Sequence, residues 1–544
     1  MLLASVFAVL PQVRLTHDLR IPDQELEQIG VSYSLHQGFM AAAPGQVLNL
    51  SGETLLNEFS IVDDCILFPS LMDGIHAVRG YSPMNGFVVN GILFWLALLL
   101  IAILGDALAG YAGAFAGLLM LVGQPMFCLA ATSSDRGLLL AVLGLLGAGM
   151  ATLHLRLGSK LSQSLLLSVC SLLLLADPSG FVLVLLFLCA MPLAQKYRSG
   201  TLDITSLSLL PWFAVPALVL MRSKGWQLPL LWGNSPVALS EGFSWDLFSG
   251  NLDRLPFLLF APVGEGANNL IYSILGVLAL VLVLVLMLRS TRSGSPRLGE
   301  PALGIALLLG GCLLHVAYAL SRPDGQLDGP AQLMRSLTLP LSLACAVLLV
   351  MEGLIRKPAA RHALVGVLVF AFFMCGLPAL QHSPYVSPSQ SARETAWKQR
   401  LLGQRLMEGS YVIDKAPAFW LVHGISAGGI RRAQVHRDAL LFHLRQKTFS
   451  SLLLFQSFHV DPRNGKVEVD PSDRVGPEYV LETLEDTRTG VFSLARLSRI
   501  VRFRDAGAKD WPAEVVPTEA PAMDSPELVE RRKVYMQEFL KRIP

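Results

Sequence analysis

The chain has 544 residues, of which 53% are hydrophobic and only 15% are charged, and its formal net charge is +2. Soluble globular proteins carry about 25% charged residues, so this deficit points to lipid as the main solvent and argues against a soluble enzyme. The small net charge, without a basic stripe among aromatic residues, argues against a nucleic-acid partner. The seven cysteines show no CxxC spacing, which predicts small buried side chains rather than a disulfide framework or a metal site.

The first 85 residues combine a short apolar segment with a long polar loop. Residues 1–13 are apolar but shorter than the ~20 residues of a spanning helix, and Pro11 and Arg14 close the segment early. We expect a short first span, with a cleaved signal peptide as the alternative. The polar loop 14–85 follows, with a predicted helix start at Pro22.

The middle of the chain is a series of apolar segments. With the first segment they predict about eleven spans. Pro125, Pro178 and Pro211 are expected to bend or end helices. The expected spans are 86–104, 108–131, 137–154, 163–176, 181–195, 205–221, 267–288, 302–320, 337–354 and 362–379.

The orientation of the spans follows from the basic residues, because cytoplasmic loops carry an excess of lysine and arginine. Alternate short loops are basic, and the loops between them carry acidic or mixed charge. This places loops 14–85 and 222–266 and the C-terminal region outside the cytoplasm. The basic loops hold Arg156, Lys160, Lys196, Arg198, Arg289, Arg292, Arg297, Arg356, Lys357 and Arg361.

Two further regions have their own character. The loop 222–266 is rich in aromatic residues, including Trp245, and predicts a re-entrant or interfacial loop with two short amphipathic helices. Residues 380–544 are more polar and long enough for one small α/β domain. Helices are predicted over 393–407 and 525–542, strands over 410–413 and 449–460, and a turn over 461–466.

Asp63 and Asp64 stand out on the first loop, because a membrane environment accounts for the apolar segments but not for two adjacent carboxylates. Two adjacent carboxylates repel each other, so one of them is expected to hold a proton, a cation or a basic partner. One could act as a general base on an acceptor hydroxyl, while the other orients that hydroxyl or holds a divalent cation. The alternative is a solvated pair that caps a helix beginning at Cys65.

Other ionisable residues lie near predicted membrane boundaries. Arg335 could bind a lipid phosphate bidentately, or it could be an arginine whose side chain reaches the interface from a helix start. Asp135 is either functional or the cap of the span that starts at Gly137. Arg136 and Arg79 are lesser phosphate candidates, His76 is a surface or catalytic histidine, and His315 is an ionisable residue within a span.

This layout resembles the C-type (GT-C) glycosyltransferase superfamily, whose members are polytopic enzymes that use polyprenyl-phosphate sugars. The resemblance rests on Asp63-Asp64 on the first external loop, followed by Gly74, Gly80 and Asn85-Gly86. It also rests on Ser134-Asp135-Arg136 on the next external loop, and on the segment from Arg335 to Pro340. It implies that Asp63 is the catalytic base, that Asp64 and Asp135 support it, and that Arg335 meets the lipid phosphate.

The sequence therefore predicts an α-helical polytopic membrane protein with a GT-C-like module over 1–379 and an extracytoplasmic α/β domain over 380–544. The predicted function is the transfer of a sugar from a polyprenyl-phosphate donor to a hydroxyl of a lipid, glycan or protein acceptor, in the bacterial inner membrane. Alternatives are a lipid-linked glycan polymerase or ligase, and a non-catalytic transport or assembly protein. The catalytic candidates are Asp63, Asp64 and Asp135, with Asp63 and Asp64 as ligands of any divalent cation; the substrate-binding candidates are Arg335, Arg136, Arg79, His76, Asn85 and Trp245.

Overall fold

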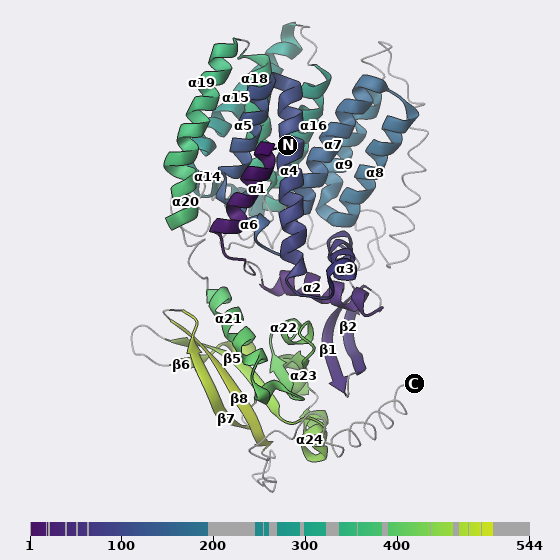
Figure 1. Ribbon diagram of the computed structural model, residues 1–544, viewed down its shortest axis with the longest axis vertical. Helices are drawn as coiled ribbons and strands as arrows, with labels where there is room; N and C mark the ends of the chain where they lie inside the picture. The colour runs from purple at the N-terminus through teal and green to yellow at the C-terminus, as the bar shows by residue number, and fades with distance from the viewer. Residues whose placement is uncertain are drawn as a thin grey trace. The chain divides into compact units, whose positions relative to one another are not determined.

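A computed structural model describes most of the chain, and its contacts divide it into two units (Figure 1). The first unit comprises residues 1–21, 63–75 and 84–387, and the second comprises 22–62, 76–83 and 388–544. The described residues are 2–17, 19, 22–38, 41–50, 53–61, 65–193, 245–253, 255–260, 269–293, 299–321, 337–355, 357–382, 390–435, 437–460, 467–476, 478–490 and 492–503.

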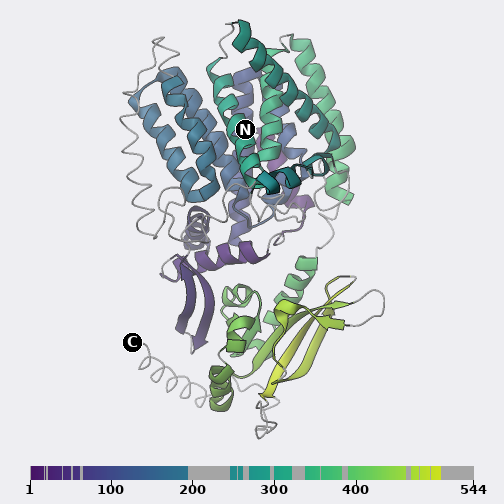
Figure 2. The same cartoon turned by 180° about the vertical axis from the view of Figure 1, so that it is seen from behind.

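The first unit is a bundle of apolar helices, seen from both sides in Figures 1 and 2. Within the described residues, five helices are long and apolar enough to cross a membrane, or six if a bent pair counts as one span. The predicted number of eleven spans stays a prediction. The helices are α1 (Leu2–Arg14), α4 (Asn85–Ala109), α5 (Tyr111–Val122), α6 (Pro125–Ala131), α7 (Gly137–Leu157), α8 (Lys160–Ala176), α9 (Phe181–Leu188), α13 (Trp245–Leu252), α14 (Leu255–Phe260), α15 (Leu270–Ser293), α16 (Glu300–Leu320), α18 (Thr338–Gly353), α19 (Pro358–Ala371) and α20 (Leu377–His382), with a π-helical turn over Phe372–Gly376.

Glycine and proline shape the bundle where the chain turns. α4 and α5 are joined at Gly110, which has φ +66°, and they pack closely at Gly105 and Gly113, where an added Cβ would collide with backbone. The predicted continuous span 108–131 is in fact the pair α5 and α6, bent by 74°. The bend follows from Pro125, which starts α6 because it has no N–H to continue α5.

The helices alternate in direction, so the bundle has two ends. α7 begins at Gly137 and packs against α8, which returns after the left-handed Gly158 and the capping Ser159. Arg156 and Lys160 therefore lie at one end, and Asp135 and the residues after α8 at the other. We call the second end the Asp135 end.

Burial distinguishes the centre of the bundle from its lipid-facing helices. α18 is almost completely buried and packs on α16, α15 and α5. α15 and α19 leave large apolar side chains exposed, among them Leu278, Leu284 and Phe370. Apolar surface of this kind is stable only in lipid or against another apolar surface, so the chain is a multi-pass integral membrane protein.

The second unit is built on one mixed sheet of eight strands in the order β2-β1-β4-β3-β5-β8-β7, with β6 paired to β5. β3 runs parallel to both β4 and β5, and the other pairs are antiparallel. Its elements are α2 (Pro22–His36), β1 (Ala42–Leu50), β2 (Glu53–Ile61), α21 (Gln390–Leu402), β3 (Tyr411–Asp414), α22 (Ala418–Leu421), β4 (Ser426–Gly429), α23 (Ile430–Val435), α24 (Arg437–Gln446), β5 (Leu452–Val460), β6 (Val467–Val469), β7 (Tyr479–Arg488) and β8 (Ser493–Phe503).

The first loop differs from the sequence-based description, which assigned residues 14–85 to the membrane module. Its β1–β2 hairpin belongs to the sheet of the second unit, because Gln46 and Val47 of β1 pair with β4. The Gln46 side-chain amide donates to the Tyr411 hydroxyl at 2.7 Å, which fixes β1 on β3 and β4. α3 (Leu67–Arg79) follows, and the boundary between the units falls within it.

Most other local predictions are confirmed where the residues are described. α2 starts at Pro22, α21 covers much of the predicted helix 393–407, and β3 and β5 lie in the predicted strands. Five of the seven cysteines are buried, Cys189 is exposed and Cys375 is half-buried. The predicted span 205–221, most of loop 222–266, the turn 461–466 and the helix 525–542 lie outside the described residues.

Candidate active site

The residues between α6 and α7 form the first part of the site. Asp135 is buried, and its Oδ2 accepts the N–H of Gly137 at 2.9 Å, which satisfies one of the N–H groups at the start of α7 that have no partner within the helix. Asn90 of α4 donates from Nδ2 to the backbone carbonyls of Ser133 and Asp135, at 2.8 Å each. Asp135 therefore binds the start of α7, although the N-cap position itself is occupied by Arg136, and α4 holds the segment that carries both residues.

Arg136 pairs with the loop that follows α8. Its Nε lies 3.1 Å from Oδ2 of Asp177, and both side chains are largely buried. Burial would raise the pKa of Asp177, but the guanidinium of Arg136 and two hydrogen bonds from Ser179 outweigh it and hold that pKa below its usual value. Asp177 is thus a carboxylate whose charge Arg136 balances.

The contacts continue from Asp177 into the centre of the bundle. Ser179 donates from both its N–H and its hydroxyl to Oδ1 of Asp177, at 2.8 and 2.5 Å. The Ser179 hydroxyl also lies 2.8 Å from Nε2 of His315 on α16. Nδ1 of His315 lies 3.2 Å from the hydroxyl of Thr338, the first residue of α18. A continuous polar chain therefore links the starts of α7 and α18 at the Asp135 end.

Two more candidates lie on elements of this unit. Asn85 is buried in the first turn of α4. Trp245 is 72% exposed on α13 and packs edge-on against Phe248. Nδ2 of Asn251 on the same helix donates to the carbonyl of Leu320 at 2.9 Å, which ties α13 to the end of α16 that also carries His315.

The remaining predicted residues lie in the second unit or outside the described residues. Asp63, Asp64 and Arg335 lie outside the described residues. Arg79 and His76 belong to the second unit. Arg79 is exposed, whereas His76 is buried against the rings of His36 and Tyr81 and makes a 3.3 Å hydrogen bond to the Ser32 hydroxyl.

Sequence reasoning found part of the cluster. It singled out Asp135 and Arg136 by their position, and His315 as an ionisable residue within a span. It counted Asp177 only as a loop charge, and Ser179 and Thr338 carried no signal in the sequence. Only the packing of α16 against α9 and α18 brings these residues together.

A metal site is not formed by the residues that the structure describes, since no three histidine, cysteine, aspartate or glutamate side chains gather closely enough. The expectation that Asp63 and Asp64 hold any divalent cation stays a prediction.

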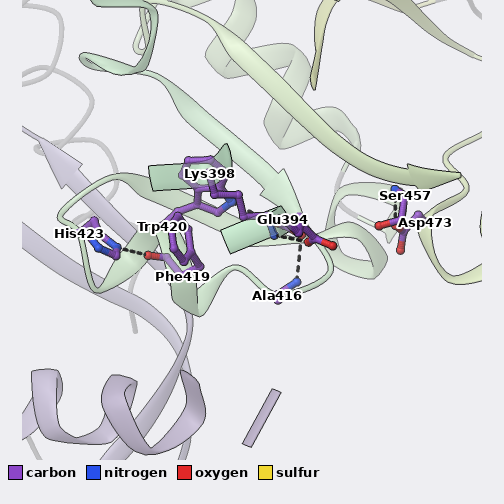
Figure 3. A network of polar contacts seen from close by, with 9 residues as sticks. Glu394, Lys398, Ala416, Phe419, Trp420, His423, Ser457 and Asp473 are labelled. Atoms are coloured by element: carbon purple, nitrogen blue, oxygen red, sulfur yellow. Dashed lines mark hydrogen bonds and ion pairs between the residues drawn. The ribbon is translucent and has the colours of Figure 1, made fainter. Parts of the chain in front are cut away.

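The second unit contains its own buried ion pair, shown in Figure 3. Nζ of Lys398 lies 2.8 Å from Asp414 and 2.9 Å from Glu394, and 4.0 Å from the centre of the Phe455 ring. Asp414 also accepts hydrogen bonds from the Trp420 indole and the Ala416 N–H, at 2.7 and 3.2 Å. The attraction of the two carboxylates exceeds the effect of burial and raises the pKa of Lys398. Both carboxylate oxygens of Asp414 therefore accept hydrogen bonds. We interpret the cluster as a structural ion pair at the end of β3, in which each charge needs its partner.

These features define a multi-pass membrane protein with a bundle of apolar helices and a mixed-sheet domain. No protein-family model matches the sequence, and no curated protein matches it significantly. The structure is similar to that of ArnT from Cupriavidus metallidurans bound to undecaprenyl phosphate, with a TM-score of 0.54 and 13% identity over 91% of this chain and 97% of that chain. It also aligns with an oligosaccharyltransferase from Archaeoglobus fulgidus over 86% of this chain and 72% of that chain, with a TM-score of 0.47 and 10% identity. The first similarity shows that this chain has the GT-C fold, as the sequence resemblance predicted.

Proposed function

We propose that this protein transfers a sugar from a polyprenyl-phosphate donor to an acceptor hydroxyl at the extracytoplasmic face of the membrane. The observation that carries the proposal is the fold, which is shared almost end to end with a protein solved with undecaprenyl phosphate. The polar chain at the Asp135 end supports it, because ionisable residues within a membrane bundle are costly and mark functional sites.

The reaction would proceed by displacement at the anomeric carbon. The acceptor oxygen attacks this carbon, the bond from the carbon to the phosphate oxygen breaks, and polyprenyl phosphate leaves with the electron pair. The hydroxyl proton passes to the carboxylate of Asp63 as general base, and the configuration inverts. Arg335 would balance the charge that develops on the phosphate, since a guanidinium binds phosphate oxygens bidentately.

Asp64 and Asp135 would support Asp63 in this scheme. Asp64 would orient the acceptor hydroxyl or, with Asp63, hold a divalent cation if the reaction needs one. Asp135 would keep its capping bond to Gly137 and add negative charge to the rim of the site. Asn85 and Trp245 would contact the sugar or the acceptor, with the exposed indole of Trp245 as an apolar platform.

The orientation follows from the distribution of charge. Arg156 and Lys160 lie at the end of the bundle opposite Asp135, and the positive-inside rule assigns that end to the cytoplasm. Eleven spans would then place the first loop and the second unit outside, in a bacterial inner membrane. The acceptor would be a lipid, glycan or protein that reaches this face.

The test replaces Asp63 by Asn in the full-length protein in proteoliposomes. A panel of undecaprenyl-phosphate hexoses and pentoses, labelled in the sugar, is offered, and transfer or release of label is measured. Loss of a general base lowers the rate by about 10²- to 10⁴-fold. The matched control is Asp73→Asn on α3, a nearby carboxylate outside the proposed chemistry, which should retain activity.

Unchanged activity of the Asp63→Asn protein at a normal protein level would remove Asp63 from the mechanism. Activity with diphosphate-linked donors but not with monophosphate-linked donors would favour the polymerase or ligase alternative.

A further inference from the structure

In the polar chain at the Asp135 end, the donor and the acceptor of each hydrogen bond follow from the number of protons that each side chain carries. Ser179 has one hydroxyl proton, and it is donated to Asp177. The short contact between the Ser179 oxygen and Nε2 of His315 is then a bond that His315 donates. Nδ1 of a neutral imidazole is an acceptor, so Thr338 donates its hydroxyl proton to it. Thr338, His315 and Ser179 thus form a one-way series of donors that ends on the carboxylate of Asp177.

Together with Arg136, which pairs with Asp177, this series joins four segments that are distant in sequence. Arg136 precedes α7, Asp177 and Ser179 lie between α8 and α9, His315 lies on α16, and Thr338 starts α18. His315 is 4% exposed and Thr338 is 2% exposed, so water does not replace these bonds. Breaking one of these hydrogen bonds would leave a buried polar group without its partner, which costs free energy. The series therefore holds its segments in a fixed arrangement.

The last member, Thr338, lies at the start of α18, a helix that is almost completely buried. The series therefore anchors the start of α18 to the segment that carries Asp135 and Arg136, and Arg136 is one of the phosphate candidates.

We propose that His315 and Thr338 are positioning residues that set the phosphate-binding geometry of the donor lipid, by tying the start of α18 to the Arg136–Asp177 pair. This inference rests on the proposed function. It assigns the series a role in binding the lipid monophosphate and none in the transfer step itself.

The test measures binding of undecaprenyl phosphate to the full-length protein in nanodiscs. His315→Phe removes both hydrogen bonds and keeps a ring, and it should weaken binding about tenfold, which is about 1.4 kcal/mol. Thr338→Val removes only the terminal hydroxyl and should weaken binding in the same direction. Thr338→Ser restores a hydroxyl and should restore the affinity.

A matched control exists on α7. His154 is also buried, and its Nδ1 lies 3.0 Å from the hydroxyl of Ser162. It lies about 27 Å along the helix from Arg136, at the opposite end of the bundle. His154→Phe should leave the dissociation constant unchanged, even if the thermal unfolding temperature falls.

The outcomes separate the two proposals. If the wild-type protein binds the lipid, and His315→Phe and Thr338→Val bind it equally well, the series is only structural and this inference is wrong. Equal weakening by His154→Phe would also overturn it, because the effect would then be global. If the wild-type protein does not bind undecaprenyl phosphate, the proposed function fails first. If His315→Phe does not fold, the comparison of Thr338→Val with Thr338→Ser tests the inference. These two variants differ mainly in one hydroxyl group, and thermal unfolding checks that both are folded.

Discussion

The ion pair between Arg136 and Asp177 offers a test of the site that does not depend on knowing the substrate. We consider the variants Arg136→Gln and Asp177→Asn, alone and together, in a double-mutant cycle. At 3.1 Å and an effective dielectric constant of about 20, the Coulomb attraction is about 5 kcal/mol. Desolvation and the partial exposure of both side chains reduce this value, so we expect a coupling energy of about 1–3 kcal/mol.

The cycle is measured as the free energy of unfolding in mixed detergent micelles. Each single variant should lose about 2 kcal/mol, and the double variant should lose little more than either single variant. The control cycle uses the more exposed pair Arg496–Asp486 of the second unit, where the coupling should stay below about 1 kcal/mol. Additive losses at Arg136 and Asp177, within about 0.5 kcal/mol, would refute the inferred strength of the pair.

Three further predictions concern single positions. Asp135→Asn keeps an oxygen that can accept the Gly137 N–H, so unfolding should change by less than about 1 kcal/mol while sugar transfer falls; equal transfer would restrict Asp135 to capping. Lys398→Met should destabilise the second unit by about 3–5 kcal/mol, because Asp414 and Glu394 lose their cation, and chemical denaturation that shows no loss would contradict this. Burial lowers the pKa of His443 to about 4, so the unfolded state takes up a proton first as pH falls below about 6.5, and stability should drop by up to about 3 kcal/mol by pH 4. His443→Phe should remove this part of the pH dependence. If the variant and the wild-type protein lose stability equally as pH falls, His443 is not the cause of that loss.

Local sequence patterns predicted the elements that depend on local forces. Long apolar runs gave α4 and α7, and Pro125 marked the place where α5 ends. Proline and aspartate at Pro22-Asp23 marked the start of α2, because these residues favour a helix start.

Non-local pairing was beyond such patterns. The sequence predicts a polar loop where the β1–β2 hairpin lies, although Ser51-Gly52 between its strands is a turn signal. Its place in the sheet depends on the pairing of Gln46 with Gly428, which no local pattern encodes. In the same way, the sequence marked Asp135 and Arg136 by their position, but the link from Arg136 to Thr338 needs four packed segments.

The most direct test of the account is a structure of the protein determined with undecaprenyl phosphate in nanodiscs. We expect the phosphate at the Asp135 end of the bundle, bound by Arg335, with the Asp63 carboxylate facing the space beside the phosphate that the sugar of the donor would occupy. A phosphate bound at the Arg156 and Lys160 end, or Asp63 and Asp64 facing open water far from the lipid headgroup, would contradict the proposed enzyme.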